Sequence, residues 1–301
     1  MRIPVAVSPM AFVMDSNAAL SLAVSRAGGL GAVASASLEV GQVRDAVNRA
    51  LSTADRQSLI QLNVWLPISI ELERVLLSDY GVDRGRVVLS TIFGLWSAPR
   101  LKRLRAAGFH SWWAQVATAD EAVLAEQAGA DVVVLQSANA GGHRATLFPD
   151  VPGVAESARA DLKSALQRVK VPIVAAGGIA CGRSMAEALS MGAVAVQCGS
   201  VFLRSPEAAL APSFAAALGT AAGNTVPTRL YSGRVARAVA STLPALSEPL
   251  LPYPEQRAKM QARGIVAHMA GTEAYRSEAR GAETIAEQMW RDCQQIMKVK
   301  S

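Results

Sequence analysis

A regular alternation of short apolar runs and longer amphipathic stretches constrains the fold of this chain more than any other feature. A strand-like run followed by a stretch with helical period occurs eight times before residue 218. Parallel neighbouring strands need such crossover connections, and eight of them are enough for a sheet to close on itself with its helices outside. We therefore predict an α/β fold, a (β/α)8 TIM barrel.

The predicted elements follow this alternation along the chain. Strands are predicted at residues 3–7, 30–33, 59–64, 87–89, 111–116, 132–135, 173–176 and 195–197. The helices that follow them are predicted at residues 16–27, 39–49, 70–78, 98–106, 120–128, 157–169, 184–190 and 207–217. Several of these helices end near a glycine, such as Gly28 or Gly192, which supplies the left-handed stop that helix ends favour.

The pattern changes after residue 218. Residues 219–254 carry many small residues and four of the fourteen prolines, and helical periodicity returns at residues 253–269 and 284–297. We predict two parts on this basis. The barrel covers residues 1–218, and a small helical cap covers residues 219–301, with the last helix packing back on the barrel.

Composition narrows the functional class. Hydrophobic residues make up 51% of the chain and charged residues 18%, which excludes a largely disordered protein. The net charge of +6 comes from scattered basic residues, so no nucleic-acid partner is expected. The chain has no long apolar run and no signal-peptide pattern, so we expect a cytoplasmic protein that does not span a membrane. The three cysteines lie far apart, which argues against disulfides and against a thiolate zinc site.

Two glycine-rich loops follow the last two predicted strands. Gly177 and Gly178 come after the seventh strand, and Gly199 and Ser200 come after the eighth. Paired glycines before a helix let backbone N–H groups approach an anion, and the positive end of the helix favours a phosphate. These two strands usually supply the phosphate site of a TIM barrel. The loops therefore predict a phosphorylated cofactor or sugar phosphate.

A third loop, after the sixth predicted strand, carries Gly141, Gly142 and His143. Imidazole has a pKa near neutrality, so a histidine on a loop at the reactive end of a barrel is the best general base in the chain. The other histidines are expected to be structural, because His110 opens a strand at the opposite end and His268 lies in the cap. We predict His143 as the catalytic base.

The predicted strand ends carry amides and apolar side chains: Met10, Asn63, Gln115, Gln136 and Gln197. The sequence has no HExxH motif or carboxylate cluster for a metal, no paired carboxylates for glycoside hydrolysis and no GxSxG nucleophile. An amide-lined apolar pocket with a phosphate site and one base suits a flavin. Amides can hydrogen-bond the polar edge of the flavin ring, and the cofactor carries the redox chemistry.

The segments that carry these features resemble the nitronate monooxygenases, formerly called 2-nitropropane dioxygenases, which are FMN-dependent (β/α)8 enzymes. The resemblance extends from about residue 3 to residue 237. It rests on these segments in the family's order: Pro9-Met10-Ala11, Ala27-Gly28-Gly29-Leu30-Gly31, Ala140-Gly141-Gly142-His143-Arg144, Ala175-Ala176-Gly177-Gly178-Ile179, Gln197-Cys198-Gly199-Ser200 and Ser232-Gly233-Arg234-Val235-Ala236-Arg237.

The resemblance implies a role for each matching position. His143 would remove the α-proton of a nitroalkane, the nitronate would reduce FMN, and O2 would complete the cycle. FMN would be bound by Met10, Ala11, Asn63, Gln115, Gln136, Gly141, Gly177, Gly178, Gln197, Cys198, Gly199 and Ser200. The expected partners are therefore a nitro compound or nitronate and O2, without a metal. Association into a homodimer is left open.

Several positions depart from the residues that are common in such families: Phe12, Trp96, Ser137, Asn139 and Cys181. These departures bear on the substrate more than on the cofactor. Two other functions stay open. One is a flavin-dependent enoyl-acyl carrier protein reductase that uses NAD(P)H, which is similar in fold and in its Gly-Gly-His loop. The other is a flavin- or phosphate-binding module without turnover.

Overall fold

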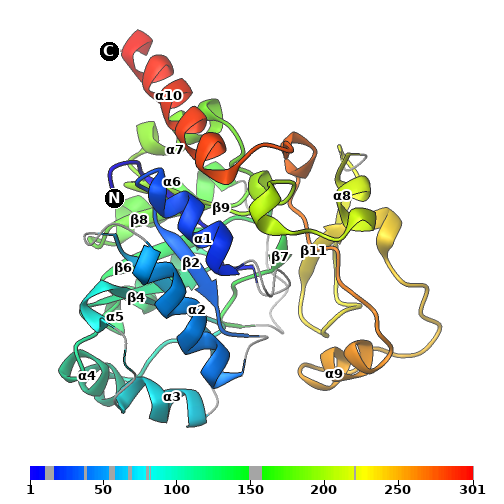
Figure 1. Cartoon of the computed structure of the whole chain (residues 1–301), viewed down its shortest axis with the longest axis horizontal. Coiled ribbons are helices and arrows are strands. Elements are labelled where there is room, and N and C mark those ends of the chain that lie inside the picture. Colours follow the sequence, from blue (N-terminus) through cyan, green and yellow to red (C-terminus); the bar gives the residue numbers. More distant parts are fainter. Residues whose placement is uncertain are drawn as a thin grey trace.

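A computed structural model describes residues 1–10, 17–36, 39–53, 58–66, 70–78, 81, 83–148, 158–219 and 222–300. Its centre is a sheet of eight parallel strands: β1 (Val5–Val7), β2 (Gly31–Ala34), β3 (Ile60–Trp65), β4 (Val87–Ile92), β5 (Ser111–Val116), β6 (Val132–Gln136), β8 (Ile173–Ala176) and β9 (Ala195–Cys198). β1 pairs with β9, and a parallel bridge between Ala6 and Leu30 joins β1 to the start of β2. The sheet therefore closes, and the predicted (β/α)8 barrel is confirmed (Figure 1).

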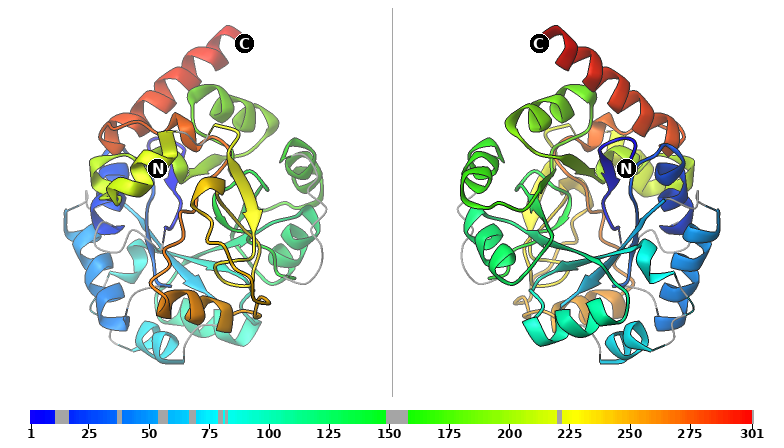
Figure 2. Two further views of the ribbon diagram at one scale, coloured as in Figure 1. Left: turned by 90° about the vertical axis from the view of Figure 1, so that its right-hand side faces the viewer. Right: turned by 90° about the vertical axis from the view of Figure 1, so that its left-hand side faces the viewer.

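Helices surround the strands (Figure 2). They are α1 (Asn17–Arg26), α2 (Val40–Thr53), α3 (Ile70–Leu77), α4 (Ala98–Ala106), α5 (Ala119–Gln127), α6 (Ala158–Arg168) and α7 (Gly182–Met191). None of the helices in the described part of the chain is long and apolar enough to cross a membrane.

The predicted helix at residues 207–217 is wrong in its first half. Pro206–Ala208 form only a 3-10 turn, and α8 spans Pro212–Gly219. Between them, Ala209 has a left-handed φ of 45°. A left-handed residue cannot continue a right-handed helix, and the proline then starts a new one because its ring favours the first helical turn.

Side chains alternate between two layers of the core, as the pleat of a strand requires. On β3, Ile60, Leu62 and Val64 belong to the apolar cluster that packs the helices against the barrel. A second cluster, which includes Val88, Trp113 and other inward residues, fills the barrel itself. The inward positions near the carboxyl ends of the strands are polar, and they begin the site described below.

The segment between α8 and α10 (Ala282–Lys300) lies over one end of the barrel, whereas this final helix lies outside it (Figure 2, left). β10 (Thr225–Thr228) and β11 (Ala236–Val239) form an unpredicted hairpin, and β11 also pairs with the short strand β7 (Gly142–His143). α10 packs on α7, where Gly182 leaves room for the close approach. The division of the chain at residue 218 stays a prediction.

The predicted helix at residues 253–269 is wrong beyond residue 262. α9 spans Glu255–Ala262 and ends before Gly264, which has a left-handed φ of 67°. The following segment is extended, and Met269 forms an antiparallel bridge with Ala238 of β11. Gly264 ends the helix. Pairing with the hairpin then provides hydrogen-bond partners for backbone groups near Met269, which in a longer helix would have bonded within the helix.

Candidate active site

A cavity of about 920 Å³ lies between the cap and the carboxyl ends of the barrel strands. His143 lines it together with these predicted FMN contacts: Met10, Asn63, Gln115, Gln136, Gly141, Gly177, Gly178, Gln197, Cys198, Gly199 and Ser200. Ala11, also predicted to bind FMN, lies outside the described residues. The fold thus brings together in one cavity side chains that come from at least six separate loops and strands.

Amide side chains from several strands meet at the barrel side of the cavity. Asn63 Nδ2 donates to Ser90 Oγ at 3.0 Å, and Gln197 Nε2 donates to Gln115 Oε1 at 3.5 Å. The Oε1 atom of Gln197 is buried and accepts no hydrogen bond from the described residues. A buried acceptor without a donor costs about 1–3 kcal/mol. The cavity therefore offers this oxygen to an N–H group of a ligand.

The two glycine-rich loops lie beside each other in the cavity wall. Gly177 and Gly178 have φ values of 93° and 73°, in the left-handed region that favours glycine. A Cβ on Gly177 would lie 2.6 Å from Ser137 Oγ, so this position excludes a side chain. The turn brings bare backbone to the cavity shortly before α7 begins. Ser200 at the second loop accepts a hydrogen bond from the Gly271 N–H at 2.9 Å, so the cap covers this corner.

Two of the predicted contacts also have structural roles, and a third is a buried thiol. The Gln136 amide holds the sixth loop, because Nε2 donates to the His143 carbonyl at 3.0 Å and Oε1 accepts from the Ala145 N–H at 2.8 Å. Gly141 packs closely on the backbone of Gly271, where a Cβ would not fit. Burial raises the pKa of the Cys198 thiol to about 12, so this thiol is neutral.

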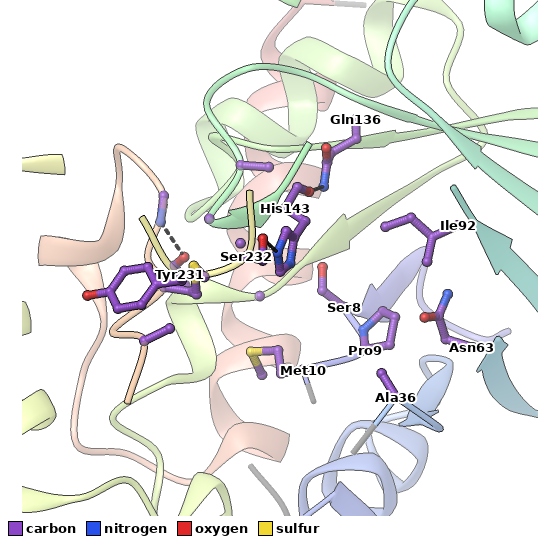
Figure 3. Close-up of a pocket in the computed structure, with 18 of the residues that line it drawn as sticks. Ser8, Pro9, Met10, Ala36, Asn63, Ile92, Gln136, His143, Tyr231 and Ser232 are labelled. Atoms are coloured by element: carbon purple, nitrogen blue, oxygen red, sulfur yellow. Dashed lines mark hydrogen bonds between the residues drawn. The ribbon is translucent and has the colours of Figure 1, made fainter. Parts of the chain in front are cut away.

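The cap fixes the position of His143. Its short strand β7 pairs with β11, with His143 opposite Ala236. His143 Nε2 lies 2.6 Å from Ser232 Oγ, and Figure 3 shows the two side chains side by side in the cavity wall. Ser232 belongs to a segment that resembles the family, but nothing in the sequence predicts its contact with His143.

Aromatic rings and arginines surround the imidazole. The ring centroids of Trp65 and Phe93 lie 5.3 and 5.8 Å from that of His143, both in edge-to-face contact. Arg234 stacks over Phe93 and Arg257 over Trp65, with Cζ to centroid distances of 3.9 and 4.9 Å. Burial, and then the charges of Arg234 and Arg257, lower the pKa of His143 to about 3. The imidazole is therefore neutral near pH 7, as a general base must be.

Two arginines of the Ser232–Arg237 segment hold the loop that carries His143. The sequence did not predict this role for them. Arg234 Nη2 donates to the Thr146 carbonyl at 2.9 Å, and Arg237 Nε donates to the Ala138 carbonyl at 3.0 Å. Both bonds are charge-assisted, a class that contributes more to stability than neutral hydrogen bonds. The loop that carries His143 is thus held at both of its ends.

The unusual residues of the sequence have mostly structural places. Trp96 packs in the core on Trp112, with ring centroids 5.4 Å apart. The Cys181 N–H donates to Ser184 Oγ at 3.3 Å at the start of α7, as one half of a capping box. Asn139 lines the cavity, whereas Phe12 lies outside the described residues. Among the departures that the structure describes, Asn139 is the one that lines the cavity, so the cavity wall departs from the family's common residues in the loop after β6.

The sequence comparisons agree on one family, and the structural comparisons include two differently named proteins. A sequence model described as nitronate monooxygenase matches residues 1–300. The nitronate monooxygenase of Paraburkholderia phytofirmans is 30% identical, over 83% of this chain and 77% of the relative. The nitroalkane oxidase of Streptomyces ansochromogenes shares the fold with a TM-score of 0.83 and 24% identity, over 99% of this chain and 98% of that one. FabK from Thermotoga maritima gives a TM-score of 0.79 and 25% identity, over 99% and 94%.

Proposed function

The chain belongs to the nitronate monooxygenase family, and we propose that it oxidises a nitroalkane or alkyl nitronate, with FMN as cofactor and O2 as oxidant. The observation that carries the proposal is the position of His143. Its ring lines the same cavity as the strand-end amides and both glycine-rich loops. A base, a set of ring-binding amides and a phosphate site are what a flavin-dependent oxidation begun by proton removal requires.

The residues present fit FMN. The buried Gln197 Oε1, which accepts no hydrogen bond from the described residues, suits an N–H on the polar edge of the flavin ring. The backbone at Gly177 and Gly178, shortly before α7 begins, and at Gly199 in the second glycine-rich loop suits a phosphate. When bound, FMN supplies the acceptor for the electrons of the nitronate and passes them to O2.

His143 acts on the proton at the α-carbon of the substrate. The neutral imidazole accepts this proton, while the hydrogen bond to Ser232 fixes the orientation of the ring. The low pKa of His143 makes it a weak base, because the proton affinity of a base falls with its pKa. A substrate that arrives as the nitronate has already lost this proton. We therefore expect nitronates to react at least as fast as the parent nitroalkanes.

An absorbance spectrum of the purified protein tests the cofactor, and anaerobic reduction tests the reaction. We expect bound or reconstituted FMN, whose absorbance is bleached by ethylnitronate but not by NADH. Bleaching by NADH alone would favour the enoyl reductase instead. Flavin that no donor reduces would indicate a binding module, and a protein that cannot take up FMN would overturn the flavoenzyme proposal.

A further inference from the structure

A cationic side chain reaches the cavity from the cap. Arg257 lies on α9 and lines the cavity, and among the described lining residues it is the one arginine, with no lysine beside it. The carboxylates that line the same cavity are Glu39 and Glu273. Arg257, which belongs to the cap, is therefore the permanent positive charge that an anionic ligand in this cavity would contact.

The position of Arg257 is fixed relative to the base. Its Nη2 donates to the Ala36 carbonyl at 3.0 Å, and its guanidinium stacks over Trp65, which in turn contacts the His143 ring edge-to-face. A stacked and hydrogen-bonded guanidinium has lost much of its conformational freedom before a ligand arrives, so little more is lost on binding. The same ring thus orients both the cation and the base.

The charge of Arg257 already acts at the reaction site. It contributes, after burial and Arg234, to the lowered pKa of His143, so its field extends to the imidazole. A nitronate carries its negative charge on two oxygens in one plane. A planar guanidinium fork matches two such oxygens better than an ammonium does.

We infer that Arg257 binds the charged oxygens of the nitronate and makes the site selective for substrates in the anionic form. This inference rests on the proposed function. Arg257 is then a specificity-determining residue that the cap contributes. A neutral nitroalkane gains little from this contact, since a charge-assisted hydrogen bond needs an ionised partner.

Nitrate is a planar oxyanion that tests this binding without any turnover. Isothermal titration of nitrate into the purified protein is compared for the parent, Arg257→Gln and Arg263→Gln. Arg263 ends the same helix but pairs with Glu248 and does not line the cavity, so its variant has the same change of charge on the cap. We expect Arg257→Gln to weaken nitrate binding by about ten- to a hundredfold. Arg257→Lys should weaken it by less, and Arg263→Gln should hardly change it.

Kinetics on the FMN-loaded protein provide the second measurement. We expect Arg257→Gln to raise the KM for ethylnitronate by about ten- to a hundredfold, while the KM for neutral nitroethane and the affinity for FMN change little. Equal nitrate binding in Arg257→Gln and the parent would overturn the inference. So would equal losses for nitronate, nitroethane and FMN, which would make Arg257 only a structural tie of α9. If nitrate binding depends on Arg257 but the protein shows no flavin activity, the anion site stands and the proposed function is wrong.

Discussion

His143 Nε2 and Ser232 Oγ lie 2.6 Å apart although 89 residues separate them in the chain. Ser232 Oγ also accepts a hydrogen bond from the Arg234 N–H at 3.3 Å, which anchors the hydroxyl to the cap. The imidazole therefore takes its orientation from the cap, whereas its backbone belongs to a barrel loop. Under the proposed function, catalysis by His143 would therefore depend on both the barrel loop and the cap.

Ser232→Ala removes the side-chain partner of the imidazole. We expect kcat for a neutral nitroalkane to fall about fivefold, because one hydrogen bond of this kind contributes about 1 kcal/mol to orientation. Steady-state kinetics and an FMN titration measure the effect. Ser78→Ala, on an exposed hydroxyl of the barrel surface, is the control. A drop in FMN affinity that accounts for the whole loss would argue against a role in orienting the base.

His143→Ala separates proton removal from electron transfer. We expect oxidation of neutral nitroethane to fall about 10²- to 10⁴-fold, the usual contribution of general-base catalysis. Oxidation of ethylnitronate should fall much less, because its proton is already gone, and FMN should remain bound. Oxygen consumption with each substrate is the measurement. Unchanged turnover of nitroethane would remove His143 from the role of base.

The lowered pKa of His143 also makes stability depend on pH. The unfolded chain binds a proton at this histidine below about pH 6.5, whereas the folded protein does so only near pH 3. Between these values the unfolded state holds more protons, so the free energy of unfolding should fall as the pH drops. Denaturant titrations of the FMN-free protein at pH 7 and pH 5 measure this fall. His143→Gln should lose less stability than the parent over the same interval, and an equal loss would contradict the prediction.

Gln197→Leu should weaken FMN binding more than it changes the stability of the free protein. In the FMN-free protein, removing the acceptor that lacks a donor favours the fold, but Gln115 Oε1 loses the hydrogen bond from Gln197 Nε2, so the free energy of unfolding should change by less than about 1 kcal/mol. The substitution should weaken FMN binding by about tenfold, because the cofactor loses one hydrogen bond. Thermal unfolding with and without FMN measures both effects. Gln61→Leu is the control. The Gln61 amide is buried, its side-chain atoms have no partner among the described residues, and it does not line the cavity, so this variant should change stability but not FMN binding.

Gly177→Ala tests the predicted phosphate loop. The substitution places a Cβ at a left-handed φ and 2.6 Å from Ser137 Oγ, so we expect it to destabilise the fold by about 1–3 kcal/mol and to weaken FMN binding. Gly223→Ala has a similar φ of 66° but open space around it, and should carry the strain without the loss of FMN. Fluorescence titration with FMN decides between them. Equal FMN affinity in both variants would place the phosphate elsewhere.

Local information in the sequence was sufficient for the barrel and for much of its cavity wall. The strands at residues 60–65 and 132–136 were readable because alternation and apolar runs reflect burial of each segment by itself. The glycine-rich loop at Gly177 and Gly178 was recognisable from its paired glycines, and the structure gives both a left-handed φ that glycine adopts freely. The helix predicted at residues 253–269 failed where pairing of Met269 with Ala238 replaced helical hydrogen bonds.

By itself, then, the sequence determined the strands of the barrel, most of the helices around it and its glycine-rich loops, since backbone conformation and periodic burial are local properties. The tertiary structure alone decided which side chains meet His143. Ser232 lies 89 residues away, and Arg257 bonds to Ala36 across 221 residues. Such contacts depend on how the cap packs over the barrel, and no pattern within either segment specifies the distance between them.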